Sequence, residues 1–160
     1  MSLPRPQPSL RARAVRYLAQ REHSRLELRR KLSRYCDEPD VIDALLDDLE
    51  RTHLLSGERF ALSLIHRRQQ RYGNLRIAQE LGTHGLAADA TAAPLQALKD
   101  SELARAQAAW ARKFQSLPQD ASERARQARF LTQRGFSSET VRAVLRGAGV
   151  DEDGSGDPAP

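Results

Sequence analysis

The sequence predicts an all-α protein built as a tandem array of about three three-helix repeats. Three observations predict this fold class. Ala, Leu, Arg, Gln and Glu, which favour helices, dominate the 160 residues. Apolar residues recur at intervals of three and four rather than two, which is the helical period. Finally, residues 11–32 align without gaps to residues 124–145, with ten of 22 positions identical.

The first repeat, residues 9–54, contains three expected helices. Ser9 can cap the first of them. Ser24 and Glu27 have the spacing of a capping box, in which the glutamate reaches back to the serine amide, and they open the second. Pro39 falls in the first turn of the third, where proline is tolerated. The residues that this third helix should bury are Val41, Ile42, Leu45, Leu46 and Leu49.

The second repeat, residues 55–99, starts a helix at Ser56-Gly57, and Asn74 is expected to cap the next one. A further helix is expected over residues 88–98, followed by a separate helix that starts at Glu102.

The third repeat, residues 100–148, contains that helix and two more, over residues 121–134 and 137–146. Such units cannot bury an apolar face alone, and stacking of neighbours supplies the core. We therefore expect the array to be elongated and curved.

The two ends of the chain differ from this helical middle in composition. Residues 1–8 contain three prolines and predict a flexible lead-in. Residues 149–160 are acidic and poor in apolar side chains, so they predict a disordered tail.

Composition excludes several classes of protein. No apolar run is long enough to span a bilayer, and the N-terminus has no secretory signal. A single cysteine, Cys36, forms neither an internal disulfide nor a thiolate zinc site. The four histidines show no metal-binding spacing, and no glycine-rich phosphate loop is present. We expect a cytoplasmic monomer that is not an enzyme and has no cofactor.

The net charge of +5 conceals an alternation of basic and acidic blocks. Residues 1–35 sum to +8, residues 36–58 to −7 and residues 103–147 to +6. Opposite charges in neighbouring blocks indicate either internal attraction or a molecule with separate basic and acidic faces. The simpler interpretation is that the charged residues of each block lie on ordinary solvent-exposed helix faces.

Clusters of arginine are the best candidates for a binding surface. Arginine outnumbers lysine 23 to three, which suits bidentate recognition of carboxylate or phosphate. Stacking on single-stranded bases needs exposed aromatic rings, and most of the few aromatic residues here fit core positions. The candidate partner-binding residues are Arg25, Arg29, Arg30, Lys31, Arg67, Arg68, Arg71, Arg76, Arg126, Arg129 and Arg134.

Three motifs, in this order along the chain, resemble the RecX family. The first is the segment from Ala14 to Leu32, and the last is Arg129-Phe-Leu-Thr-Gln-Arg-Gly-Phe136. Between them lie Gly57-Glu-Arg-Phe-Ala61 and then Tyr72-Gly-Asn-Leu-Arg-Ile-Ala-Gln-Glu-Leu81 with Gly85. The resemblance covers about residues 10–147. Glu58 stands where the family more often has Asp, and Asn74 where proline is frequent.

The resemblance implies a non-enzymatic regulator of the RecA recombinase that bears on recombination, DNA repair and the SOS response. Proteins of this family bind along the groove of the RecA–DNA filament and contact more than one protomer. They suppress RecA's ATPase and strand exchange and limit filament growth, and some bind DNA directly. On this interpretation, charge reversal at Arg67, Arg68 and Arg71 weakens filament binding without unfolding the chain.

Two other functions stay open. The chain could bind single- or double-stranded DNA directly, without RecA, in which case affinity falls steeply with salt. It could also be a tandem-helical adaptor for another acidic protein.

Overall fold

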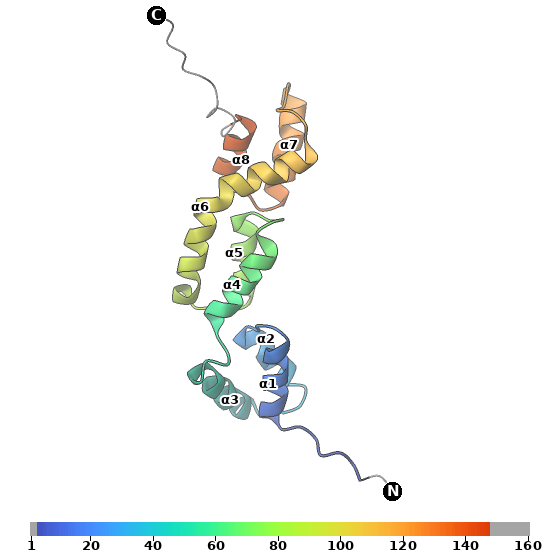
Figure 1. Ribbon diagram of the computed structural model, residues 1–160, viewed down its shortest axis with the longest axis vertical. Coiled ribbons are helices and arrows are strands. Elements are labelled where there is room, and N and C mark those ends of the chain that lie inside the picture. Colours follow the sequence, from blue (N-terminus) through green and yellow to red (C-terminus); the bar gives the residue numbers. More distant parts are fainter. Residues whose placement is uncertain (1–2, 148–160) are drawn as a thin grey trace, which may run out of the picture. The chain divides into compact units, whose positions relative to one another are not determined.

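A computed structural model describes residues 3–147, and within them it contains eight α-helices and no strand (Figure 1). The predicted all-α class is confirmed. Residues 3–9 are exposed and lack regular secondary structure, while the predicted acidic tail lies outside the described residues. The helices are α1 (Leu10–Gln20), α2 (Arg25–Leu32), α3 (Pro39–Arg51), α4 (Gly57–Arg68), α5 (Asn74–Thr83), α6 (Ala88–Lys113), α7 (Ala121–Gln133) and α8 (Ser138–Leu145).

Helix α6 corrects one prediction. The separate helices expected on either side of residue 100 are one continuous helix of 26 residues with Pro94 inside it. Proline removes one intrahelical hydrogen bond, but alanines surround it and favour the helix. Thr91 and Leu98, seven residues apart on one face, are both buried, so packing also favours continuation through the proline.

The chain divides into two compact units according to its internal contacts. One comprises Met1–Leu64 with Leu81–Ala92, and the other comprises Ile65–Glu80 with Ala93–Pro160. The division passes through α4, α5 and α6. The boundaries of the three repeats stay a prediction, as does the elongated, curved form of the array.

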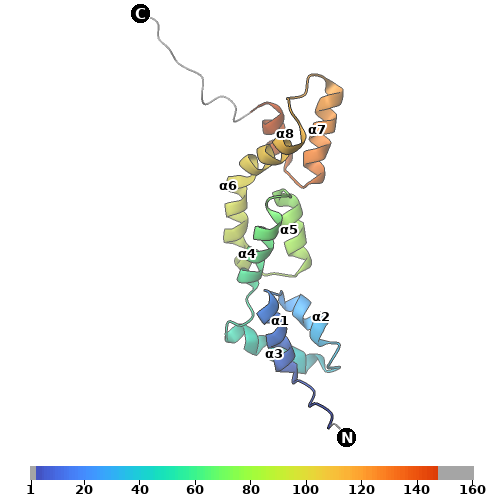
Figure 2. The ribbon, with the colours of Figure 1, turned by 45° about the vertical axis from the view of Figure 1, so that its right-hand side comes forward.

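In the N-terminal unit, α1 packs against α2 and α2 packs against α3 (Figure 2). The hydroxyl of Ser24 accepts a hydrogen bond from the Glu27 amide at 3.1 Å, as the capping box predicts, whereas the Glu27 carboxylate binds the Arg21 guanidinium. Val41, expected in the core, is 46% exposed because it lies in the first turn of α3 at the edge of the apolar stripe. The core consists of Ala14, Leu28, Leu32, Ile42, Leu46, Leu49 and Leu55.

In the C-terminal unit, α7 and α8 pack against each other (Figures 1 and 2). Residues of α6, α7, α8 and the turn between α7 and α8 form one apolar core, made of Ala106, Ala109, Leu131, Phe136, Val141, Val144 and Leu145. The side chain of Ser137 caps α8 by accepting from the Thr140 amide at 3.2 Å. This core and cap hold α7 in place beside the end of α6.

Two charged residues of α6, the buried Glu102 and the partly buried Arg105, organise the C-terminal unit. The Glu102 carboxylate accepts the backbone N–H groups of Asn74 and Ser137, which stand at the starts of α5 and α8, at 3.1 and 3.3 Å. The Arg105 guanidinium donates to the carbonyls of Gln69 and Tyr72 at 3.1 and 2.9 Å. Asn74 was expected to cap α5, but its side chain binds Arg105, and the carboxylate of Glu102 reaches the helix start instead.

Candidate functional site

The basic residues of α2 face the acidic helix α3. Arg25 forms ion pairs with Asp47 at 2.7 Å and Glu50 at 3.1 Å, and Arg29 pairs with Asp43 at 3.1 Å. These carboxylates belong to the block of charge −7, so the opposite charges of the first two blocks attract each other within one unit. Arg25 and Arg29 therefore have internal partners for their charge, which makes them weaker candidates for an anionic ligand.

Lys31 lies against a buried histidine. Its Nζ is 2.8 Å from Nε2 of His23 and 4.8 Å from the centre of the Tyr17 ring. Nδ1 of His23 is 2.9 Å from the Arg21 carbonyl oxygen, so Nδ1 carries the proton and Nε2 accepts from the ammonium. Burial, together with the nearby cations, lowers the pKa of His23. Arg30, the remaining candidate on α2, is exposed.

The basic residues of the middle segment have mixed surroundings. Arg68 forms a two-pronged pair with Glu80, with both its Nε and its Nη2 3.0 Å from carboxylate oxygens. Arg71 and Arg76 both lie on the ring of Tyr72, at 5.9 and 4.0 Å from its centre. Arg67 is exposed. The structure thus neutralises Arg68 but leaves the guanidinium groups of Arg71 and Arg76 around an aromatic side chain.

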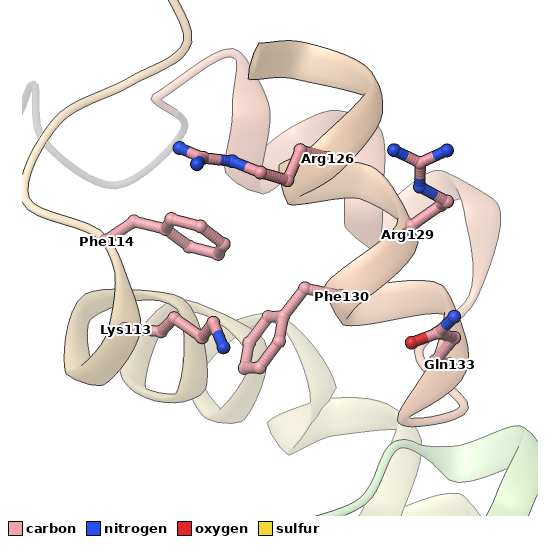
Figure 3. Close-up of a pocket in the computed structure, with 6 residues that line it drawn as sticks. All are labelled: Lys113, Phe114, Arg126, Arg129, Phe130 and Gln133. Atoms are coloured by element: carbon pink, nitrogen blue, oxygen red, sulfur yellow. The ribbon is translucent and has the colours of Figure 1, made fainter. Parts of the chain in front are cut away.

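The third cluster lines an open hollow between the end of α6 and one face of α7 (Figure 3). Its volume is about 500 Å³. Figure 3 shows the rings of Phe114 and Phe130 facing this space, with Arg126 reaching from α7 over Phe114 and the guanidinium of Arg129 pointing away from both rings. The lining residues are Lys113, Phe114, Arg126, Arg129, Phe130 and Gln133, and we call this hollow the Phe114–Phe130 groove.

The two phenylalanine rings meet edge to face, with their centres 5.4 Å apart. Cations lie over both rings. The guanidinium carbon of Arg126 is 5.8 Å from the centre of Phe114, and Lys113 Nζ is 5.2 Å from that of Phe130. Both rings are only half-buried. The groove therefore combines a flat apolar floor with positive charge at its edges.

A second hollow of about 490 Å³ continues the groove, because Lys113 and Phe130 line both. It adds Arg112 and Arg134, and the Arg134 guanidinium lies 4.5 Å from the centre of the Phe130 ring. Among the described residues, no carboxylate lines either hollow. Within the described residues, the cations that line these hollows therefore lack the carboxylate partners that Arg25 has in its own unit.

The structure brings together Arg126, Arg129 and Arg134, three of the candidate partner-binding residues expected from the sequence, around two adjoining hollows. Sequence reasoning missed the aromatic floor and the two cations of α6, Arg112 and Lys113. A signal for Phe130 was present, since it lies four residues after Arg126 and four before Arg134, and this spacing places all three on one helix face. Phe114 follows the last residue of α6, so no helical pattern indicated its exposure.

Other candidate chemistry finds no support in the described residues. Among them, no group of three or more His, Cys, Asp or Glu side chains could hold a metal ion. The thiol of Cys36 is partly buried and faces the Glu38 carbonyl oxygen at 3.7 Å. No helix in the part of the chain that the structure describes is both long and apolar enough to cross a membrane.

The repeated helical units match known protein domains in order. Residues 11–49 match the first three-helix domain of RecX, residues 58–93 the second, and residues 100–145 the third. The chain belongs to the RecX family. This establishes the tandem arrangement of three-helix domains that the internal repeat predicted.

Relatives in other bacteria match over nearly the whole chain. Regulatory protein RecX of Ralstonia nicotianae is 49% identical over 158 residues, which is 99% of both chains. Regulatory protein RecX of Herbaspirillum seropedicae is 52% identical over 151 residues, covering 94% of this chain and 98% of the relative. The family is thus one of regulatory proteins.

A solved structure shows the same fold at much lower identity. The crystal structure of RecX from Lactobacillus salivarius superimposes with a TM-score of 0.75 at 16% sequence identity. The match covers 88% of this chain and 95% of the other. The RecX fold is therefore shared, although few side chains are.

Proposed function

We propose that this protein binds RecA and occupies the groove of the RecA–DNA filament, where it bridges protomers and inhibits the ATPase, strand exchange and filament extension. It would thereby modulate recombination and DNA repair. Family membership supports a regulatory role, and the RecA partner follows from the family resemblance. We further propose that it acts in the cytoplasm as a monomer.

The observation that carries the proposal is the uneven neutralisation of the basic clusters. Arg25 and Arg29 are paired with carboxylates of their own unit, whereas the cations around Phe114 and Phe130 have no carboxylate among the groove residues that the structure describes. A filament on DNA presents both acidic side chains and phosphate, which suits a protein with this unneutralised surface. The working surface is therefore expected on the third domain, with Arg71 and Arg76 as further contacts.

The proposed mechanism is steric and conformational and needs no catalysis. A protein that contacts two protomers shifts the filament toward the state it binds better, by no more than its differential affinity for the two states. Its presence in the groove would also exclude a second DNA strand.

The test is RecA ATPase activity on single-stranded DNA with this protein at substoichiometric amounts. We expect inhibition that saturates well below one molecule per RecA, because each bound molecule affects a filament rather than a protomer. Arg126→Glu combined with Arg129→Glu should weaken it, whereas Arg124→Glu, an equal change of charge per site outside the groove lining, should not. Wild-type protein without effect at any ratio would remove the proposal.

Two alternatives make different predictions. Direct DNA binding without RecA is favoured by one observation, the aromatic floor of the groove, and predicts an affinity for naked DNA that falls steeply with salt. If the chain is instead an adaptor for an unrelated acidic protein, a pull-down with this chain should recover that protein and no RecA.

A further inference from the structure

We propose that the chain's own acidic segment, residues 151–157, docks in the Phe114–Phe130 groove and in the hollow that continues it, and shields their cations from external anions. The segment follows α8 and lies outside the described residues. Docking itself requires no other protein. Its regulatory consequence, that an anionic partner must first displace the segment, rests on the proposed function of this surface.

The two hollows gather positive charge that attracts an anionic occupant. Arg112 and Arg134 donate to the backbone carbonyls of Gln70 and Arg71 at 2.9 and 3.1 Å, and these neutral acceptors leave their charge in place. Among the described residues, neither hollow is lined by a carboxylate. The cations that line the two hollows are Arg112, Lys113, Arg126, Arg129 and Arg134.

The acidic residues at the start of α7 are bound to the backbone of that helix end. Asp120 accepts the backbone N–H of Glu123 at 2.8 Å, and the carboxylate of Glu123 accepts the backbone N–H of Gln119 at 2.9 Å. Neither residue lines the hollows. The acidic residues that follow α8 are therefore the chain's best complement to this charge.

Residues 150–157 have a composition that matches the groove. They contain no basic residue, and the apolar Val150 directly precedes the acidic part. Phe114 and Phe130 are only half-buried and form an apolar floor beside the cations (Figure 3). An apolar side chain followed by carboxylates thus suits a floor bordered by positive charge. The acidic residues are Asp151, Glu152, Asp153 and Asp157.

The end of α8 brings the segment within reach of the groove. A Cβ placed on Gly147 would lie 3.1 Å from Cδ1 of Leu117, so the last described residue contacts the loop between α6 and α7. Phe114 is three residues before Leu117, so their Cα atoms lie within about 11 Å of each other. An extended chain reaches about 14 Å from Gly147 at residue 151 and about 35 Å at residue 157. The segment is therefore long enough to reach both hollows.

Attachment to the same chain favours this occupant over a free acidic peptide. A short tether gives an effective concentration in the millimolar range, so weak ion pairs are enough to fill the hollows. The same segment of a second copy has the same chemistry, but its docking would depend on protein concentration. Docking within one chain would not.

The first experiment places a nitroxide on the segment and records its effect on the backbone amides of the full chain by NMR. The labelled protein carries Gly154→Cys together with Cys36→Ser, so the label has one attachment point. We expect broadened amide signals over residues 112–114 and 126–134 at low salt, unchanged on dilution. In about 1 M salt, where charges more than about 3 Å apart are screened, the broadening should disappear. Broadening that falls on dilution would overturn the inference and assign the groove to the segment of a second copy.

Matched variants separate docking from the mere proximity of the label to α8. A neutralised segment keeps the tether and should remove the broadening. Lys113→Gln with Arg126→Gln should do the same, whereas Arg124→Gln with Arg142→Gln, an equal loss of charge at exposed sites outside the lining, should not. Equal broadening with the wild-type and the neutralised segment would overturn the inference. The neutralising substitutions are Asp151→Asn, Glu152→Gln, Asp153→Asn and Asp157→Asn.

The second experiment measures shielding, with polyglutamate as the external anion. The unlabelled chain with the neutralised segment should bind it about tenfold more tightly than wild type, the factor expected for a site that is filled about nine-tenths of the time. Trp110 emission reports the binding, because this single tryptophan has its ring centre 6.4 Å from that of Phe114. With Lys113→Gln and Arg126→Gln added, the difference between the two segments should vanish.

Equal affinities of the wild-type and the neutralised chain for polyglutamate would overturn the shielding, as would a difference that persists without Lys113 and Arg126. Neither experiment contains RecA. Failure of the docking therefore leaves the proposed inhibition of RecA standing, and absence of RecA inhibition leaves the docking standing.

Discussion

The backbone of Gly73 lies directly on that of Gly135. The Gly73 N–H donates to the carbonyl of Arg134 at 2.7 Å, and a Cβ placed on Gly73 would lie 2.3 Å from the carbonyl carbon of Gly135. These residues belong to the turn before α5 and the turn before α8, so two equivalent turns of successive domains are in contact. Only glycine permits this approach.

Gly73→Ala should therefore lower the free energy of unfolding by about 1–3 kcal/mol, the usual cost of overpacking. Gly82→Ala is the matched control, because a Cβ there meets nothing within 4 Å and the residue lies in α5. That change should stabilise by about 0.5–1 kcal/mol. Urea unfolding measures both, and an unchanged midpoint for Gly73→Ala would contradict the turn contact.

The side chain of Glu102 should stabilise the folded chain in its ionised form. Burial alone would raise the pKa of its carboxyl group, but hydrogen bonds from Thr140, Asn74 and Ser137 outweigh burial and hold the pKa below its ordinary value of 4.5. The stability that it contributes is present above the unfolded pKa and is lost as pH falls through the lowered folded pKa.

Glu102→Gln should cost about 1–3 kcal/mol, because the new NH2 group faces N–H and O–H donors and leaves one of them without an acceptor. Denaturant unfolding below pH 4.5 should show the variant and the wild type converging. If the two proteins still differ in free energy of unfolding when the wild-type carboxyl is protonated, the shape of the Glu102 side chain, and not its charge, stabilises the fold.

Because of His23, the free energy of unfolding should depend on pH below about pH 6.5. Its pKa is lowered from 6.5 by burial, so the unfolded chain takes up a proton before the folded one does. Stability is full above about pH 6.5 and falls as pH drops from there to the lowered folded pKa.

Thermal unfolding from pH 8 to pH 5 checks this prediction. Wild type should lose stability across the lower part of the range, and His23→Gln should have a flatter profile. His66→Gln, an exposed histidine, should keep the wild-type slope. Equal slopes for all three proteins would mean that His23 accepts its proton freely when folded.

Charge reversal in the middle segment should separate stability from binding. Arg68→Glu places two carboxylates together, because Glu80 already occupies the other side of that pair, and should cost about 1 kcal/mol. Adding Glu80→Arg should recover most of the loss. The triple reversal of Arg67, Arg68 and Arg71 therefore carries a stability cost that the sequence did not indicate.

Arg71→Glu alone is the cleaner test of binding. This side chain is exposed, so the free energy of unfolding should change by less than about 0.5 kcal/mol. Inhibition of RecA ATPase should weaken if the segment contacts the filament. Full inhibition by this folded variant would exclude Arg71 from the binding surface.

Local features were predictable from sequence because their causes are local. Ser9 and Ser24 accept from amides three residues on, as a capping serine does, and their partners are fixed by the chain itself. The break expected near residue 100 was wrong because burial of Leu98 and Glu102 supports a continuous α6. Burial depends on residues distant in sequence, which a local pattern does not contain.

Some features of the candidate site are likewise set by the local sequence, and others only by the packing of helices. The sequence by itself determined which residues are basic, that α7 presents Arg126 and Arg129, and that three helical units follow one another. The tertiary structure alone decided that Arg25 is neutralised by Asp47, 22 positions away, and that Phe114 and Phe130 face an open hollow. The reason is physical: a helix face is set by a period of 3.6 residues, whereas the partner of a charge and the exposure of a ring are set by which helices pack together.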